Sequence, residues 1–397
     1  MADGKLRVAI FSDSALPILN GVSVSIDTLV QALRRAGHSV HIYTSGAPLY
    51  RDPDPNTFRS WAVETPWSKG YPLAIPPFYR ALREFRKHTY DIIHTHTPFT
   101  MGFVGLRWAQ SHDIPIVSTY HTLYDRYAHY VPFFPRRYVR FKIAKHTHFY
   151  YSSVSEVIVP SEAARRWLQR HAVKTPITVI PTGTPERRIL DRAEVRVQLG
   201  LEPGERMLLY VGRVAKEKNL GPLFEMAARV MAQRPETRLW LVGDGPYRGE
   251  AMAVVRSLGV GDKVRFVGAV PRHEVDRYYC AADVFVFSSL TETQGLVLQE
   301  AMTYGLPAVA YVGGGASETI RDGVNGFGVR NDVSDFADRV LQVLSDDSLY
   351  ARLSRGAIEF VRERGSTAMV RAVVEVYRRA IGTYVPEEVR GGRLAWF

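Results

Sequence analysis

Short apolar runs alternate with amphipathic segments along most of the chain. The first run is LRVAIFS, and it is followed by a segment at residues 24–36 whose apolar positions recur at helical spacing. The alternation continues through the runs SVHIYTS, DIIHTHT, IPIVSTYH, EVIVPS and ITVIPTG. Strands that alternate with helices in this way predict a parallel, doubly wound α/β sheet.

The same alternation begins again at Met207. It passes through MLLYVGR, TRLWLVGDG, KVRFVGAV, DVFVFSS and LPAVAYVG before a mostly helical region. A chain of 397 residues is also longer than one hydrophobic core usually serves. We therefore expect two Rossmann-like domains, at residues 1–182 and 183–368, that face each other across a cleft.

Composition narrows the class of protein. The chain is 46% hydrophobic and 23% charged, and no apolar run approaches the roughly 20 residues that span a bilayer. The start, MADGKLRVAI, leads into a strand pattern without the apolar region of a signal peptide, so we expect a cytoplasmic protein. The single cysteine, Cys280, excludes an internal disulfide and a cysteine-cluster metal site.

The positive charge is confined to the first half of the chain. Residues 1–190 hold 24 Lys and Arg against 13 Asp and Glu, which leaves 27 of each sign in the remainder, so this half carries the whole net charge of +11. A basic domain beside a neutral one suits an anionic partner of the first half, either lipid headgroups or nucleic acid. The alternative is that the first half is basic but binds no anionic partner.

The turns after the first strands do not carry a dinucleotide fingerprint. The chain after the first strand reads SDSALPILNGVSVS, which lacks G-x-G-x-x-G and an acid placed for an adenosine ribose. This argues against a nicotinamide-dependent dehydrogenase. Ligands of doubly wound sheets bind beyond the carboxyl ends of the strands, so the strand-end loops are where chemistry is expected.

One stretch, SSLTETQGLVLQEAMTYG, combines two carboxylates with a helix start. Glu292 lies in the loop, Gln294 and Gly295 lie at the start of the helix, and Glu300 lies about two turns along it. A helix start suits a phosphate, and each carboxylate can accept hydrogen bonds from two hydroxyls. A phosphate next to a polyol indicates a sugar nucleotide, whereas the two acids in isolation could be ordinary surface residues.

Two cations follow another strand of the same predicted sheet. Arg213 and Lys218 lie in the loop after MLLYV, and a Gly-Asp-Gly-Pro turn at residues 243–246 ends the next strand. Because carboxyl ends of parallel strands meet at one edge, these loops and Glu292 should lie together. A guanidinium and an ammonium there could bind a diphosphate.

This set of motifs resembles a known family. The order G-R-x4-K, V-G-D-G-P, R-F-x-G, then E-x7-E followed by A-M-x3-G-x-P, resembles the retaining glycosyltransferases of family 4, which have the GT-B fold. The first half agrees through Asn20-Gly21-Val22, the HTHTPF run and His121. The resemblance also implies that a helix at about 369–397 packs back on the first domain. Within the family, STYHTLYDRYAHYVP and TETQGLVLQEAM are most similar to the bacterial diacylglycerol glucosyltransferases.

The resemblance implies catalytic roles for four residues. Arg213 and Lys218 would neutralise the nucleoside diphosphate as it leaves, when negative charge grows there. Glu292 would hold sugar hydroxyls, and His121 would lie beside the reacting carbon and touch the donor sugar.

The resemblance also implies a set of donor-binding residues. Gly21 would let the backbone approach the diphosphate, because a Cβ atom would crowd it. Glu300 would bind the ribose hydroxyls, and Val267 would lie near the base. Contacts to phosphate or sugar would come from the N–H groups near Gln294, Gly295 and Leu296. This chain has Thr-Gln-Gly after Glu292 where family members commonly have Phe-Gly.

No cofactor or essential metal is expected, since the nucleotide sugar is a substrate and the cations serve the diphosphate. The D-x-D sequence at residues 52–54 lies in a proline-rich loop with no strand before it and is interpreted as a surface turn. His94 and His96 would share one face of a strand, but no third ligand is evident, so both are interpreted as strand-end residues on the acceptor side.

The acceptor side carries a basic and aromatic stretch at residues 124–151. Such a segment suits a membrane interface, with cations on anionic headgroups and rings at the acyl boundary. It could also bind single-stranded nucleic acid, although no RNA-binding signature accompanies it, or be a partly buried helix with a solvated basic face. The residues expected to contact the membrane are Arg136, Arg137, Arg140, Lys142 and Lys145.

These inferences combine into one expected function. The chain should be a two-domain transferase that moves a hexose, glucose from UDP-glucose, to a membrane-lipid hydroxyl such as that of diacylglycerol, forming an α-glycoside. Its partners would be the nucleotide-sugar donor and an anionic membrane surface, without nucleic acid, and it would be peripheral on the inner face of the cell membrane. The alternatives are a family 4 transferase for a soluble sugar or sugar phosphate and a non-catalytic basic nucleic-acid-binding protein.

Overall fold

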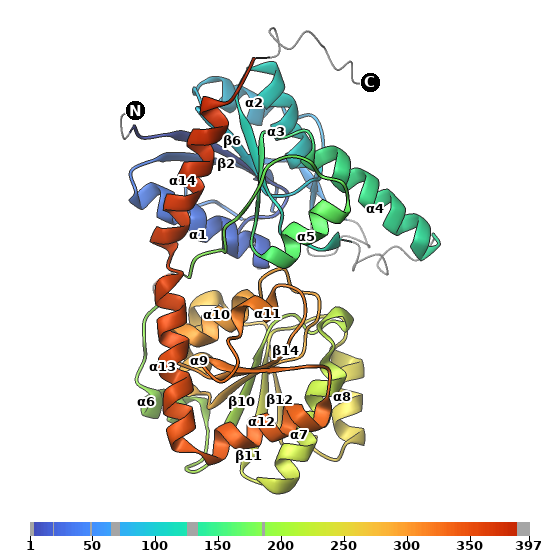
Figure 1. The fold of residues 1–397 in the computed structure, drawn as a ribbon, viewed down its shortest axis with the longest axis vertical. Helices are drawn as coiled ribbons and strands as arrows, with labels where there is room; N and C mark the ends of the chain where they lie inside the picture. Colours follow the sequence, from blue (N-terminus) through green and yellow to red (C-terminus); the bar gives the residue numbers. More distant parts are fainter. Residues whose placement is uncertain are drawn as a thin grey trace. The chain divides into compact units, whose positions relative to one another are not determined.

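The computed structural model describes residues 4–18, 20–47, 50–64, 72–124, 134–184 and 187–386. The chain divides into two compact units, each with its own sheet (Figure 1). The first unit is formed by the described residues of Met1–Gly183 and Ser366–Phe397, and the second by those of Thr184–Gly365. The prediction of two parallel-sheet α/β units is confirmed.

The first unit is built on a parallel sheet with the order β3-β2-β1-β6-β7-β8-β9. Strand β1 lies in the middle and pairs in parallel with β2 on one side and β6 on the other. A short antiparallel pair, β4 with β5, lies beside this sheet. The strands are β1 (Arg7–Ser12), β2 (Ser39–Ser45), β3 (Thr57–Ser60), β4 (Ala62–Val63), β5 (Leu73–Ala74), β6 (Ile92–Thr95), β7 (Ile116–Thr119), β8 (Glu156–Val159) and β9 (Ile177–Val179).

Both faces of this sheet are buried because its strands are apolar at successive positions. In β1, Val8 and Ile10 belong to the core on the side of α1 and α14, while Ala9 and Phe11 belong to the core on the other side. Helix α14 joins the first core through buried residues such as Tyr377. The helices are α1 (Gly21–Arg35), α2 (Tyr79–Arg86), α3 (Thr100–Ser111), α4 (Arg136–Tyr151), α5 (Glu162–Arg170) and α14 (Ser366–Gly382).

The second unit is built on a parallel sheet with the order β12-β11-β10-β13-β14-β15. Its strands are β10 (Arg206–Val211), β11 (Thr237–Val242), β12 (Val264–Gly268), β13 (Val284–Phe287), β14 (Ala308–Tyr311) and β15 (Gly326–Val329). Its helices are α6 (Arg192–Leu199), η2 (Lys216–Lys218, a 3-10 turn), α7 (Leu220–Gln233), α8 (Arg248–Ser257), α9 (Arg272–Ala281), α10 (Leu296–Thr303), α11 (Ala316–Thr319), α12 (Val333–Ser345) and α13 (Asp347–Glu363).

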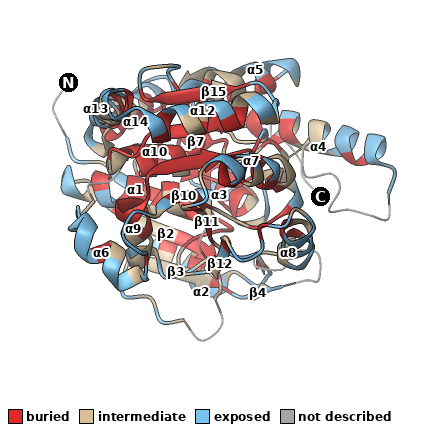
Figure 2. Ribbon diagram, turned by 90° about the horizontal axis from the view of Figure 1, so that it is seen from below, coloured by how far each residue is buried: buried red, intermediate tan, exposed pale blue. Residues whose placement is uncertain are grey.

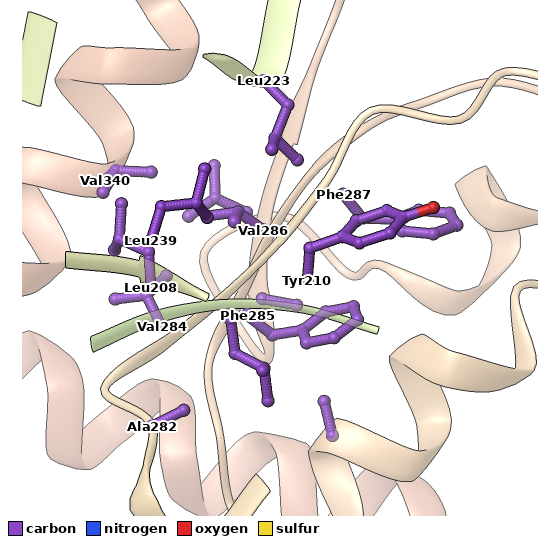
Figure 3. Packing of buried hydrophobic residues seen from close by; sticks show 14 of the residues in the cluster. Leu208, Tyr210, Leu223, Leu239, Ala282, Val284, Phe285, Val286, Phe287 and Val340 are labelled. Atoms are coloured by element: carbon purple, nitrogen blue, oxygen red, sulfur yellow. The ribbon is translucent and has the colours of Figure 1, made fainter. Parts of the chain in front are cut away.

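One continuous hydrophobic core surrounds this sheet. The central strand β13 is buried along its whole length, and Figure 3 shows its residues packed with Leu208, Leu239 and Val340 from neighbouring elements. Figure 2 shows the same pattern across both units, with buried strands and helices whose outer turns are exposed. The apolar core fixes the strands, and the loops at their carboxyl ends carry the polar side chains.

Candidate active site

Strands β10 and β13 form the point where the strand order of the second sheet reverses. Strand β10 pairs with β11 on one side and with β13 on the other, so the chain leaves the two central strands in opposite directions. Open parallel sheets bind ligands beside such a switch point, at the carboxyl ends of the strands. The loops that follow β10 and β13 are therefore the natural place for a site in this unit.

Side chains tie these two loops together. Asn219 donates from Nδ2 to the carbonyl of Ser288 at 3.2 Å, and Ser288 Oγ donates to the carbonyl of Lys218 at 3.3 Å. Thr291 Oγ1 donates to the carbonyl of Glu217 at 3.3 Å. Asn219 adopts the left-handed conformation, with φ of 54°, which asparagine tolerates better than most residues. These contacts fix η2 against the segment that carries Glu292.

Lys218, in the loop after β10, and Glu292, in the loop after β13, form an ion pair at this edge of the sheet. Their Nζ and Oε1 atoms lie 2.6 Å apart, and both side chains are less than one fifth exposed, at 18% and 19%. Ser289 Oγ also donates to Glu292 Oε1 at 2.7 Å. Burial opposes ionisation of Glu292, but the charge of Lys218 and the two hydrogen bonds outweigh it and lower the pKa of this carboxyl. Glu292 is thus an ionised hydrogen-bond acceptor at neutral pH.

Arg213 is held by the core beneath it. The Tyr210 hydroxyl donates to the carbonyl of Arg213 at 3.0 Å, and the Tyr210 ring stacks on Phe287 with centroids 6.0 Å apart (Figure 3). The guanidinium lies 3.6 Å from Oε1 of Glu217, which is buried, while Arg213 itself is one third exposed. Each predicted cation of the diphosphate site is therefore paired with an acid in this structure.

The start of α10 is shaped by glycine. Gly295, the residue before α10, has φ of 77°, a conformation that side-chain-bearing residues rarely adopt. Gln294 is buried, and its carbonyl accepts a hydrogen bond from Thr319 Oγ1 at 2.8 Å. Leu296 is the first residue of α10, so the structure brings these three predicted residues next to Glu292.

Glu300 is held by polar side chains from outside α10. Because α10 begins at Leu296, Glu300 is just over one turn into the helix, and the sequence expectation of two turns is wrong. Its Oε1 lies 3.5 Å from Arg187 Nη2, and its Oε2 accepts a hydrogen bond from the Tyr279 hydroxyl at 3.1 Å. Glu300 is 17% exposed, so one side of its carboxylate is oriented by protein while a part stays accessible.

Val267 lies in β12, two strands away from the switch point. It is partly buried against the core of this unit. The next residue, Gly268, accepts a hydrogen bond from the Gly243 amide at 2.8 Å, which ties β12 to the turn after β11. A Cβ atom on Gly243 would stand 2.0 Å from the carbonyl oxygen of Gly212, so this turn packs directly on the loop that carries Arg213.

The first unit has its own switch point between β1 and β6. Asp13 follows β1 and is buried, where it accepts hydrogen bonds from Thr97 Oγ1 at 2.7 Å and from the Met101 amide at 3.0 Å. Burial raises the pKa of Asp13 to about 6, although these hydrogen bonds act in the opposite direction.

Gly21 is exposed at the start of α1. The side chain of Asn20 caps this helix by accepting hydrogen bonds from two backbone amides.

Three histidines lie at the ends of β6 and β7. His121 follows β7, is partly buried, and has Nε2 2.9 Å from Nδ1 of the buried His96. His94 is fully buried, with one ring nitrogen 2.7 Å from the Tyr377 hydroxyl and the other 2.7 Å from Thr119 Oγ1. The interpretation of His94 as an acceptor-side residue is therefore wrong, since it joins α14 to the core.

The D-x-D sequence at residues 52–54 is a turn whose two carboxylates form ion pairs within the protein. Asp52 pairs with Arg59 at 2.7 Å, and Asp54 pairs with Arg34 at 2.8 Å, so each carboxylate of the D-x-D turn is held by an arginine. In the part of the chain that the structure describes, His, Cys, Asp and Glu do not gather in threes or more where a metal ion could be held.

Helix α4 has one buried face and one basic, aromatic face. Tyr150 donates to Thr95 at 2.8 Å and anchors the end of the helix, whereas the rings of Phe134, Tyr138 and Phe141 are about half exposed, at 55%, 46% and 55%. The Lys142 ammonium lies 5.6 Å from the ring centre of Tyr138. Residues 125–133 of the predicted membrane stretch lie outside the described residues. The five predicted membrane cations are all exposed: Arg136, Arg137, Arg140, Lys142 and Lys145.

Among the described residues, no helix is both long enough and apolar enough to cross a bilayer.

Comparison with known proteins agrees with this geometry. The family described as Glycosyl transferases group 1 matches residues 191–360, and Glycosyltransferase Family 4 matches residues 19–188. An alpha-monoglucosyldiacylglycerol synthase of Streptococcus pneumoniae is 33% identical over 77% of this chain and 71% of that protein. The protein of the same name from Acholeplasma laidlawii is 30% identical over 89% of this chain and 92% of its own length.

The chain belongs to the family 4 glycosyltransferases. Its fold agrees, because sucrose-phosphate synthase from Thermosynechococcus elongatus superimposes with a TM-score of 0.76 at 25% identity, over 95% of this chain and 100% of that one. The family resemblance and the GT-B fold expected from the sequence are confirmed, and the transferase is an enzyme of the hexosyltransferase type.

The structure of the transferase adds residues that sequence reasoning missed. Gly315 donates its amide to the carbonyl of Glu292 at 2.7 Å, and a Cβ atom on it would stand 1.8 Å from the carbonyl oxygen of Thr293. Gly314 has φ of 55°, and its Cβ would stand 2.5 Å from the Glu292 carbonyl. Three consecutive glycines after the buried run LPAVAYV were the available signal. Ser289 and Glu217, which hold Glu292 and Arg213, gave no signal of their own.

Proposed function

We propose that this transferase moves glucose from UDP-glucose to a hydroxyl of diacylglycerol and forms an α-glycoside. In this proposal the second unit binds the donor, the first unit binds the acceptor, and the enzyme works as a peripheral protein on the inner face of the cell membrane. The observation that carries the donor part is the partly buried Lys218–Glu292 pair, whose Nζ and Oε1 atoms lie 2.6 Å apart at the switch point of the second sheet.

The donor site would work by charge and hydrogen bonding. Lys218 and Arg213 would bind the diphosphate, and this contact would strengthen as the glycosidic bond breaks and charge moves to the leaving group. Glu292, released from part of its pairing with Lys218, would accept hydrogen bonds from sugar hydroxyls. Glu300, oriented by Arg187 and Tyr279, would bind the ribose hydroxyls.

Retention of configuration is proposed from the family resemblance. It would follow a front-face displacement, in which the acceptor oxygen forms its bond to the reacting carbon on the side from which the diphosphate leaves. The leaving phosphate would accept the acceptor's proton, so the chain need not supply a nucleophile. His121 would touch the donor sugar beside this carbon.

The lipid acceptor is supported by two observations. The two relatives described above are named as synthases of a glucosyl diacylglycerol. Helix α4 exposes cations and aromatic rings together, which suits an anionic bilayer surface better than bulk water.

A panel of nucleotide sugars tests the whole proposal. Release of nucleoside diphosphate is measured with and without vesicles of phosphatidylglycerol that contain diacylglycerol. UDP-glucose should give the fastest release, and only in the presence of diacylglycerol should a glucosylated lipid form. Equal transfer to a soluble sugar or sugar phosphate without vesicles would overturn the lipid acceptor, and the absence of turnover with every donor would overturn the enzyme assignment at this site.

Glu300→Ala should weaken the binding of UDP by about 10- to 100-fold, because a carboxylate that accepts hydrogen bonds from two ribose hydroxyls is lost. Isothermal titration of the protein with UDP measures this. Tyr279→Phe removes only the hydroxyl that orients Oε2 of Glu300, so it should have a smaller effect in the same direction. Unchanged affinity of Glu300→Ala for UDP would contradict the ribose role.

Replacing Arg136, Arg137 and Arg140 together by glutamine should reduce binding to anionic vesicles by about 100-fold, since each cation near such a surface contributes about 1 kcal/mol. Vesicle co-sedimentation at low salt measures the loss, and slow hydrolysis of the donor in solution should persist.

The matched control removes the same charge from the second unit. Arg352, Arg355 and Arg362 are exposed on α13, and their replacement by glutamine should leave vesicle binding close to that of the unaltered protein. An equal loss in both triple variants would show that net charge, and not α4, governs binding.

A further inference from the structure

The contact between His96 and His121 indicates which ring nitrogen of each histidine is protonated. The two residues come from neighbouring strand ends, His96 after β6 and His121 after β7. Nδ1 of His96 and Nε2 of His121 lie 2.9 Å apart, and their rings are nearly parallel with centroids 5.2 Å apart. The distance of 2.9 Å between the two nitrogens is that of a hydrogen bond.

Both rings are neutral at pH 7. Burial lowers the pKa of His121 to about 4, and burial together with the neighbouring histidines lowers the pKa of His96 well below its usual value. A neutral imidazole has one N–H donor and one bare acceptor nitrogen. The hydrogen bond can therefore run in only two ways, either from His96 to His121 or from His121 to His96.

The surroundings of His96 distinguish these two directions. Its other ring nitrogen, Nε2, is buried and has no hydrogen-bond partner among the residues that the structure describes. If His121 were the donor, the proton of His96 would lie on this Nε2 and would form a buried N–H without an acceptor. If His96 is the donor, Nε2 is a bare acceptor. Buried N–H groups without a partner are the rarer of the two in folded proteins.

The ring of His96 is also held in place. The ring of His94 lies against it, with centroids 4.1 Å apart. His94 is fixed in turn by the Tyr377 hydroxyl and Thr119 Oγ1, each 2.7 Å from a ring nitrogen. A His96 ring packed in this way keeps Nδ1 directed at His121.

We propose that His96 is a positioning residue, which donates from Nδ1 to His121 and thereby holds His121 in the tautomer with its proton on Nδ1. A ligand that reaches Nδ1 of His121 would then meet an N–H donor and not a bare nitrogen. The catalytic meaning rests on the proposed function, in which that N–H would donate to an oxygen of the donor sugar. A donor there would bind a hydroxyl or phosphate oxygen and could not act as a base.

Nitrogen NMR of the full-length protein, labelled with ¹⁵N at histidine, tests the tautomer directly. The signals of His121 are assigned by their loss in His121→Gln. The expected result is a protonated Nδ1 and an unprotonated Nε2 in His121 at pH 7. Protonation of Nε2 in His121, or a charged ring at this pH, would overturn the inference.

Variants of His96 test its effect on turnover. His96→Asn keeps an N–H donor close to the place of Nδ1, while His96→Leu fills the space without a donor. With UDP-glucose and diacylglycerol in phosphatidylglycerol vesicles, His96→Leu should lower kcat about tenfold, the scale of one hydrogen bond, and His96→Asn should recover most of it. Thermal unfolding of both variants reports whether each is folded.

The outcomes separate the positioning role from the proposed function. Equal loss of kcat in the Leu and Asn variants, both folded, would overturn the positioning role, because packing alone would then explain the loss. A His121 protonated on Nδ1, together with normal turnover in His121→Gln, would support the tautomer and refute the role of His121 at the donor sugar.

Discussion

Lys218→Ala is expected to lower kcat by about 10²- to 10³-fold, or about 3 kcal/mol of transition-state stabilisation, as is usual when one electrostatic donor is removed from a preorganised site. Two features make the effect large. Lys218 is only 18% exposed, so solvent screens its charge poorly. Its turn is also fixed by hydrogen bonds to the loop after β13, so the position of Lys218 is set before the donor binds.

Steady-state release of UDP measures this loss, and the same 3-10 turn offers a matched control. Lys216 is 65% exposed and pairs with the exposed Glu250 at 3.0 Å. Lys216→Ala removes the same charge two residues away and should keep kcat within about threefold, because exposed ion pairs contribute little. Near-normal turnover in Lys218→Ala would refute the assignment of the diphosphate site.

Glu292 makes a double-mutant cycle informative. Without Lys218, the burial of Glu292 is no longer offset by a positive charge, and the pKa of its carboxyl should rise. Part of the loss in Lys218→Ala then comes from Glu292 and not from the diphosphate. Combining Lys218→Ala with Glu292→Gln should therefore give a smaller loss of kcat than the sum of the two single losses.

Gly315→Ala is expected to destabilise the second unit by about 3 kcal/mol, at the upper end for overpacking, because the obstacle is backbone. The added Cβ atom would stand 1.8 Å from the Thr293 carbonyl oxygen, and neither side of the contact can rotate away. The segment that carries Glu292 and Gln294 would have to shift. Binding of UDP should fall together with the free energy of unfolding.

Urea unfolding and titration with UDP measure both effects of this change. Gly249→Ala provides the control, since Gly249 is exposed in α8 and its added Cβ atom would meet open space. This variant should be slightly more stable, by up to about 1 kcal/mol, as alanine is the better helix former. Unaltered stability and UDP binding in Gly315→Ala would contradict the close packing of the two loops.

The sequence predicted the parts of this structure that depend on local pattern. Strands such as VFVF at residues 284–287 are buried on both faces, and only a covered parallel sheet gives a continuous apolar run of that kind. Arg213, Lys218 and Glu292 follow such strands, so their meeting at one edge could be predicted from the order of the strands. Their spacing also matched the family motifs.

The features that could not be predicted depend on partners that are distant in sequence, or on residues whose type and spacing do not distinguish them from ordinary surface residues. His94 bonds to Tyr377, which is 283 residues away, and the alternation of side chains in one strand could not reveal this partner. Glu217 looked like any surface acid until the fold buried it beside Arg213. Thr291 and Ser288 are small polar residues of a loop, and only the position of η2 turns them into links between two strand ends.

The packing of α14 sets the order in which the two units can be completed during synthesis. All the core residues of the second unit come from Thr184–Gly365, which leaves the ribosome before α14 does. The first unit needs Val373 and Tyr377 to cover Val8 and Ile10. Domains usually fold in the order in which they are made. Here the second unit can reach its native core while the first still exposes the part of its sheet that α14 covers.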